Sequence, residues 1–168
     1  MLDVELDQST DWDTETHWIE LAIKAVEAAF LVSSHGALAN AAFTMSISIK
    51  LSDNAEVQQL NRDWRGKDMP TNVLSFPMIA SDEFDTLANT DDGEVLVGDM
   101  ILAHDVCVIE AEQKGISLPN HISHLIVHGT LHLLGYDHID EHDGDMMEAL
   151  EVKALASMGL HNPYDHHI

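Results

Sequence analysis

The stretch His128-Gly129-Thr130-Leu131-His132-Leu133-Leu134-Gly135-Tyr136-Asp137-His138 contains three histidines, at spacings of four and six residues. Positions four apart lie on one face of a helix, so His128 and His132 can point at a single ion. Gly135 can leave the helix in a left-handed conformation without steric cost, which lets the chain fold back and present His138 from a third direction. Three neutral imidazoles with a fourth position open to water are the geometry of a catalytic Zn²⁺ site. The stretch therefore predicts a metal site at the end of a helix.

Helices are predicted on both sides of this stretch. Segments 104–114, 119–134 and 141–158 read as three successive helices, and each is followed or closed by a glycine of the kind that ends helices. Two earlier helices are predicted. One covers about residues 14–33, where apolar residues recur at helical spacing. The other begins at Asp53. Asp53 and Glu56 are three residues apart, a spacing that resembles a capping box at the start of a helix.

Strands are predicted between the early helices. Residues 43–50 alternate apolar and polar side chains without interruption, which is typical of a strand with one covered face. Residues 2–6, 73–76 and 94–103 are further candidates, and the acidic segment 80–93 is predicted to be a surface loop or hairpin connection.

This order predicts an α+β fold with a small mixed sheet of about four strands, packed with five or so helices. Residues 1–160 are expected to form a single metal-dependent hydrolase domain, and 161–168 a loosely ordered tail.

Composition limits the class of protein. The chain has 168 residues, of which 45% are apolar, enough for one domain with a real core. A single cysteine, Cys107, excludes an intramolecular disulfide and favours a reducing compartment. No basic leader or long apolar run is present, so we expect a soluble, cytoplasmic protein that does not enter a membrane. The net charge of −23 opposes binding to phosphate backbones, but Arg62, Arg65 and Lys67 form a local basic group.

A catalytic metal is favoured over a structural one, because structural zinc sites usually fill all four positions and often use cysteine. Cys107 lies in an apolar helical stretch and is predicted to belong to the core. The chain has 12 histidines, and some are expected to be ordinary surface residues. No role is assigned to His17, His35, His161, His166 or His167.

The spacing also matches H-x-x-x-H-x-x-G-x-x-H, the ligand pattern of metzincin proteases. Those enzymes carry a glutamate directly after the first histidine as the general base, and here that position is Gly129. Peptide hydrolysis would lack the group that moves the proton. A metzincin-like metalloprotease without its glutamate is therefore an alternative, not the favoured reading.

Phosphodiester cleavage depends less on that carboxylate, because zinc itself lowers the pKa of bound water to about 7. Such a site needs a cation near the phosphate, and Arg65 is the candidate, with Lys67 assisting. His128 is counted with Arg65 as catalytic. Tyr136 and Asp137 lie beside the ligands and are candidates for orienting them.

Three blocks together resemble the YbeY family of bacterial rRNA-maturation factors over about residues 43–160. They are the histidine stretch, the segment from Leu60 to Pro77, which contains Arg-Gly-Lys-Asp and Val-Leu-Ser-Phe-Pro, and the segment Leu96-Val97-Gly98-Asp99-Met100-Ile101. Met147 and Glu151 also fall where the last helix of that family would place a methionine and a glutamate. One departure is Asn72, where many members of the family have aspartate.

The resemblance implies a zinc-dependent, single-strand-specific endoribonuclease that acts in 16S rRNA 3′ end maturation and ribosome quality control. It implies one ion on His128, His132 and His138 and a functional arginine at Arg65. Nickel or another divalent ion is a possible substitute for zinc, because both metals accept imidazole. The expected partners are single-stranded RNA and a ribosomal subunit or protein, and not DNA. A non-enzymatic ribosome-assembly factor, stabilised by its metal, is the remaining alternative.

Overall fold

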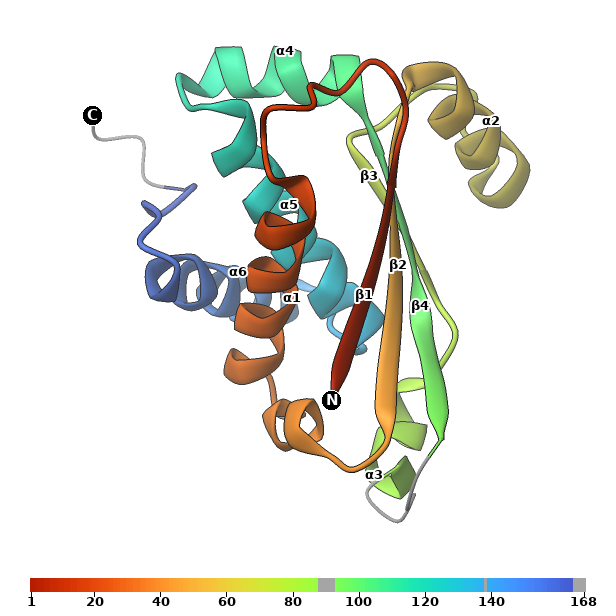
Figure 1. Ribbon diagram of the computed structural model, residues 1–168, viewed down its shortest axis with the longest axis vertical. Coiled ribbons are helices and arrows are strands. Elements are labelled where there is room, and N and C mark those ends of the chain that lie inside the picture. The colour runs from red at the N-terminus through yellow and green to blue at the C-terminus, as the bar shows by residue number, and fades with distance from the viewer. Residues whose placement is uncertain (88–92, 138, 165–168) are drawn as a thin grey trace.

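Strands and helices alternate along the first part of the chain, and helices fill the second (Figure 1). The computed structural model describes residues 1–87, 93–137 and 139–164. The strands in this part of the chain are β1 (Leu2–Gln8), β2 (Thr44–Ser52), β3 (Val73–Pro77) and β4 (Glu94–Ala103). The longer helices are α1 (Trp18–Val32), α2 (Asn54–Arg65), α4 (His104–Lys114), α5 (Leu118–Leu133) and α6 (Glu141–Ser157). Short helical turns are η1 (Gly36–Asn40), η2 (Ser81–Glu83) and α3 (Phe84–Leu87).

The four strands form one mixed sheet in the order β1-β2-β4-β3. β1, β2 and β4 are parallel, and β3 pairs with β4 in the antiparallel direction at the sheet edge. Parallel neighbours need crossover connections, and α1 supplies the one between β1 and β2. The predicted α+β class with a small mixed sheet is confirmed.

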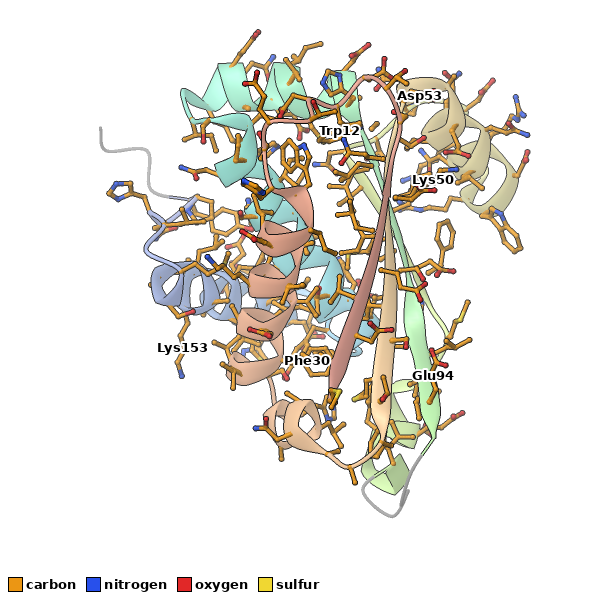
Figure 2. All side chains as sticks on the ribbon, in the orientation of Figure 1. Trp12, Phe30, Lys50, Asp53, Glu94 and Lys153 are labelled. Carbon is orange, nitrogen blue, oxygen red and sulfur yellow. The ribbon has the colours of Figure 1, made fainter. Side chains whose placement is uncertain are left out.

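Helices α1 and α5 cover one face of the sheet and α6 packs on the outside of these two helices, while α2 packs on the other face near β3 and β4 (Figure 1). Alternate residues of β2, from Met45 to Leu51, point into the main core. Phe30 of α1 is fully buried in that core, and Lys50 extends from the opposite face of β2 to pair with Glu56 at 3.0 Å (Figure 2). The sheet thus separates a thick helical layer from a thinly covered face.

Helix α5 lies close against the β3–β4 pair. Most of its residues are buried, which is typical of a helix in the centre of a domain. At Gly129 an added Cβ would collide with Met100 of β4 and approach Ser75 of β3 to 3.0 Å. At Gly98 of β4 an added Cβ would lie 2.6 Å from Leu133 of α5. These two glycines therefore let the histidine-bearing helix approach the edge of the sheet.

Local side-chain contacts set where the helices begin. Asp53 accepts a hydrogen bond from the backbone N–H of Glu56 at 2.8 Å, which confirms the predicted helix start. Helix α1 begins at Trp18 and not at residue 14, because Asp13 accepts from the N–H of Thr16 and residues 14–16 form bends.

The predicted acidic connection at 80–93 contains η2 and α3 in its first half, and residues 88–92 lie outside the described part of the chain. Among the described residues, none of the helices combines the length and apolar character required to cross a bilayer.

Candidate metal centre and active-site cavity

Helix α5 carries four histidines on one side, at spacings of three, four and four residues: His121, His124, His128 and His132. Residues three or four apart are neighbours on a helix surface, so the four rings form a continuous stripe. Their ring centroids are 6.3 Å, 6.4 Å and 4.5 Å apart in succession. The first two rings are buried, and the last two line a cavity.

His128 and His132, two of the three predicted ligands, face each other directly. Their Nε2 atoms are 3.0 Å apart, and their rings stand nearly perpendicular at 83°. This arrangement follows from the spacing of four residues, because one helical turn brings both side chains to the same point. The two imidazoles therefore converge on one point at the end of α5.

Glu151 of α6 fixes the ring of His128. Its Oε1 atom lies 3.0 Å from Nδ1 of His128 and 2.8 Å from Nε2 of His124, and the hydroxyl of Tyr164 donates to both carboxylate oxygens at 3.0 Å. Burial by itself raises the pKa of this carboxyl, but the hydrogen bonds and charge interactions with the two histidines outweigh it and lower the pKa to about 2. Glu151 is therefore an ionised acceptor, and Nδ1 of His128 carries the hydrogen.

A backbone carbonyl fixes the ring of His132. Nδ1 of His132 lies 2.9 Å from the carbonyl oxygen of Tyr136, and a carbonyl can only accept, so this nitrogen also carries its hydrogen. The phenol of Tyr136 instead bonds to Ser34, accepting from its N–H at 3.0 Å and donating to its Oγ at 3.3 Å. The orienting contact expected of Tyr136 is made by its backbone.

The facing Nε2 atoms fit a divalent cation. With hydrogen on Nδ1, each neutral ring presents a lone pair at Nε2, and two lone pairs 3.0 Å apart repel unless a cation lies between them. Two nitrogens bound to one tetrahedral zinc ion, each at about 2.0–2.1 Å, lie roughly 3.3 Å from each other. Metal-binding histidines usually donate their other N–H to a carboxylate or carbonyl, as both rings do here. The residues present therefore fit the predicted metal.

The third predicted ligand, His138, lies outside the described residues. In the part of the chain that the structure describes, no group of three or more His, Cys, Asp or Glu side chains is placed to hold a metal ion. Among the described residues, the predicted site is thus represented by the converging pair His128 and His132.

His128 and His132 line a cavity of about 1150 Å³, and Arg65 and Asp137 line it as well. Arg65 is the last residue of α2, and its exposed side chain makes no ion pair with another described residue. Arg62, one turn earlier on α2, differs, because it pairs with Asp63 at 3.3 Å and with Asp68 at 4.0 Å. The predicted phosphate-binding arginine and two of the three predicted ligands, His128 and His132, therefore share one cavity. Lys67 is exposed and lies outside the residues that line it.

Gly129 explains the missing protease glutamate. A side chain at this position points at Met100 and Ser75, towards the sheet, and not at the Nε2 atoms of the histidines. A glutamate there would collide with the core before it could reach a water molecule in the cavity.

Asn72 is accounted for by its partner on α4. Its side-chain amide donates to Glu110 at 3.0 Å, while its Oδ1 atom accepts from the N–H of Val73 at 2.6 Å. Glu110 in turn lies 2.9 Å from Nε2 of His121. An aspartate at position 72 would place a second carboxylate against Glu110, so the asparagine removes a repulsion.

Cys107 is buried in the core, as predicted, and burial raises the pKa of its thiol to about 12. A thiol that stays protonated is a poor metal ligand.

The sequence reasoning missed Glu151 and Tyr164 as partners of a ligand. For Glu151 a signal existed, because this carboxylate shares the buried side of α6 with Met147, Ala154 and Leu155. A charged residue at a core position indicates a paired group. Tyr164 falls in the segment assigned to the tail, and no local pattern links it to α6.

The solved structures provide a first comparison, which concerns the fold. The solution structure of a protein from Thermotoga maritima matches 99% of this chain and 97% of its own, with a TM-score of 0.54 and 18% sequence identity. At this identity the likeness shows a shared fold and nothing further. The chain is one of the α+β proteins that pack a four-stranded mixed sheet against a buried central helix.

Sequence comparisons define the family. The family model described as Endoribonuclease YbeY matches residues 5–159. Proteins named Endoribonuclease YbeY from Sphingopyxis alaskensis and Rhizorhabdus wittichii are 53% and 52% identical to this chain, each over 98% of its length and over 98% and 97% of their own. A relative of the same name from Zymomonas mobilis is 48% identical over 99% of this chain and 95% of its own. The chain belongs to the YbeY family, as its motifs predicted.

We predict that the two tyrosines differ in their contribution to stability. Tyr164→Phe removes a donor to the buried charge of Glu151 and should lower the free energy of unfolding by about 1–2 kcal/mol. Tyr136→Phe removes exposed, neutral hydrogen bonds to Ser34 and should cost about 0.5 kcal/mol or less. Urea denaturation of the metal-free variants measures both. An equal or larger effect of Tyr136→Phe would contradict the described hydrogen-bond network.

Proposed function

We propose that this protein is a metal-dependent, single-strand-specific endoribonuclease that acts in 16S rRNA 3′ end maturation and ribosome quality control. The observation that supports it most is the pair of Nε2 atoms 3.0 Å apart, both held by hydrogen bonds at their Nδ1 atoms, in a cavity that also contains Arg65. Membership of the family whose model is described as Endoribonuclease YbeY supports the same activity.

His128 and His132, with His138 as the proposed third ligand, would hold one divalent ion, zinc in the first instance and nickel or another ion as a substitute. An ion held by these residues would supply an activated water, whose pKa zinc sites lower to about 7, and a positive charge for a phosphoryl oxygen. The contacts to Glu151 and to the carbonyl of Tyr136 keep both rings in the tautomer that presents Nε2. The protein's own contribution is therefore a preset pair of ligands that need no rearrangement.

Arg65 would bind the phosphate. A guanidinium can donate two parallel hydrogen bonds to phosphate oxygens, and this one makes no ion pair with a carboxylate of the described residues. Its charge would oppose the negative charge that develops on phosphorus during cleavage. In a chain with a net charge of −23, this local cation gives RNA a point of attachment.

The two alternatives fit the geometry less well. A metzincin-like protease needs a carboxylate at position 129, where a side chain would point into the sheet. In an assembly factor whose metal only stabilises the fold, the ion itself would be expected to position its ligands. Here Glu151 and the carbonyl of Tyr136 already position the rings of His128 and His132. The proposed setting is the cytoplasm, with rRNA and a ribosomal subunit or ribosomal protein as partners.

Removing the metal should abolish cleavage and leave the fold intact. We expect protein treated with a chelator to lose activity on single-stranded RNA, to regain it with zinc, and to keep its far-ultraviolet circular dichroism spectrum throughout. His132→Ala should bind at least about ten-fold less metal and cleave no RNA. His161→Ala, which changes an exposed histidine that does not line the cavity, is the control and should retain both properties. Cleavage that survives complete metal removal would reject the proposal.

Arg65→Ala should reduce single-strand cleavage by about 10²-fold while the bound metal stays unchanged, because the guanidinium acts on the phosphate and not on the ligands. The matched control is Arg62→Ala on the same helix, whose side chain is engaged by Asp63 and Asp68 and does not line the cavity. Single-turnover rates and metal analysis of both variants provide the test. Equal rates for Arg65→Ala and the wild type would remove Arg65 from the mechanism.

A further inference from the structure

Trp64 is placed in a way that the proposed cleavage chemistry does not explain. It is next to Arg65 in the last turn of α2, and 72% of its surface is exposed. The other two tryptophans, Trp12 and Trp18, are 2% exposed, and their indole N–H groups donate to backbone carbonyls at 2.9 Å and 3.2 Å. A large aromatic surface left in solvent beside a functional cavity is a candidate binding surface.

Phe76 makes a ring contact with the indole of Trp64. The two ring centroids are 6.3 Å apart with an interplanar angle of 66°, an edge-to-face contact of the kind that aromatic pairs prefer. Phe76 belongs to β3, so the contact ties the exposed ring to the sheet. The indole therefore touches the sheet through Phe76 and keeps most of its surface open.

The Trp64–Phe76 pair lies where two cavities meet. Both residues line the cavity that contains His128 and His132, and both also line a second cavity of about 890 Å³ over the thinly covered face of the sheet. The second cavity is bordered by four carboxylates, Glu5, Asp7, Glu56 and Asp99. Its lysine, Lys50, is already paired with Glu56 at 3.0 Å.

These charges restrict which chemical group can bind to the Trp64–Phe76 pair. A phosphate would be repelled by the carboxylates of the second cavity, whereas a nucleobase carries no charge and binds to an aromatic ring by stacking. Because Arg65 follows Trp64 in the sequence, a phosphate held by the guanidinium would bring its neighbouring base within reach of the indole. A base that is still paired in a duplex cannot stack there without first leaving its partner.

We propose that Trp64, supported by Phe76, is a stacking platform for one unpaired nucleobase adjacent to the phosphate that Arg65 binds. The inference rests on the proposed ribonuclease function and names the surface that selects single strands. Stacking on Trp64 is an uncharged contact, so an acidic protein can bind a base in this way without a continuous basic groove.

The exposure of Trp64 provides a direct readout, because it is the one tryptophan of three that a collisional quencher such as acrylamide can reach readily. The probe is a short 2′-O-methyl phosphorothioate oligonucleotide, which resists cleavage by water or by a 2′-hydroxyl. An abasic oligonucleotide of equal length and backbone is the comparison. We expect the base-containing strand to quench the exposed fluorescence and shield it from acrylamide, and the abasic strand to do neither.

Affinity measurements on variants complete the test. Trp64→Ala should weaken binding of the base-containing strand by about ten-fold, while Trp64→Phe should stay within about three-fold of the wild type. Binding of the abasic strand should be the same for all three proteins. Ile109→Ala, an exposed apolar residue on α4 outside both cavities, is the surface control.

Failure of the stacking platform and failure of the proposed function give different results in these experiments. If the wild type cleaves RNA but Trp64→Ala binds the base-containing strand as tightly as the wild type does, the platform is rejected and the proposed function stands. If the wild type neither binds nor cleaves single-stranded RNA, the proposed function fails and the platform fails with it.

Discussion

Two hydrogen bonds donated by ring nitrogens, one to the carboxylate of Glu151 and one to the carbonyl of Tyr136, determine the geometry of the candidate site. Each fixes a hydrogen on the Nδ1 atom of a histidine and so turns a bare Nε2 atom towards its neighbour. Without these partners the imidazoles could rotate or change tautomer, and the spacing of four residues on α5 would not by itself create a pair of ligands. Other parts of the structure bring the groups that make these contacts together. α6 brings the carboxylate, the turn after α5 brings the carbonyl, and Gly98 and Gly129 allow α5 to lie against the β3–β4 edge.

Charge is distributed unevenly around this site. A carboxylate that is completely buried, as Glu151 is, costs free energy unless it is paired, and here two imidazoles and one phenol compensate it. Outside the site the chain carries a large excess of acidic residues, so long-range attraction cannot bring RNA to it. The features that favour a nucleic acid are local: the guanidinium of Arg65 and the exposed indole of Trp64. Affinity for RNA in such a protein would depend on a few short-range contacts.

Much of this fold and part of the site could be predicted from sequence, for identifiable reasons. The alternation in 43–50 and the helical spacing around His128 are local patterns, and they gave β2 and α5 within a residue or two. The capping interaction of Asp53 is also local. Contacts between distant segments were not accessible in the same way: Glu151 with His128, Tyr164 with Glu151, and Asn72 with Glu110 depend on how helices and loops pack together. The direction in which position 129 points, which argues against a protease, likewise required the packing of α5 on the sheet.

The most direct measurement of the central claim is nitrogen NMR spectroscopy of the protein with ¹⁵N-labelled histidine, without metal and after one equivalent of zinc. The account predicts that, near neutral pH and without metal, His128 and His132 both carry hydrogen on Nδ1, and that zinc shifts their Nε2 resonances strongly. A hydrogen on Nε2 of either ring, or a metal-induced change centred on Nδ1, would contradict it.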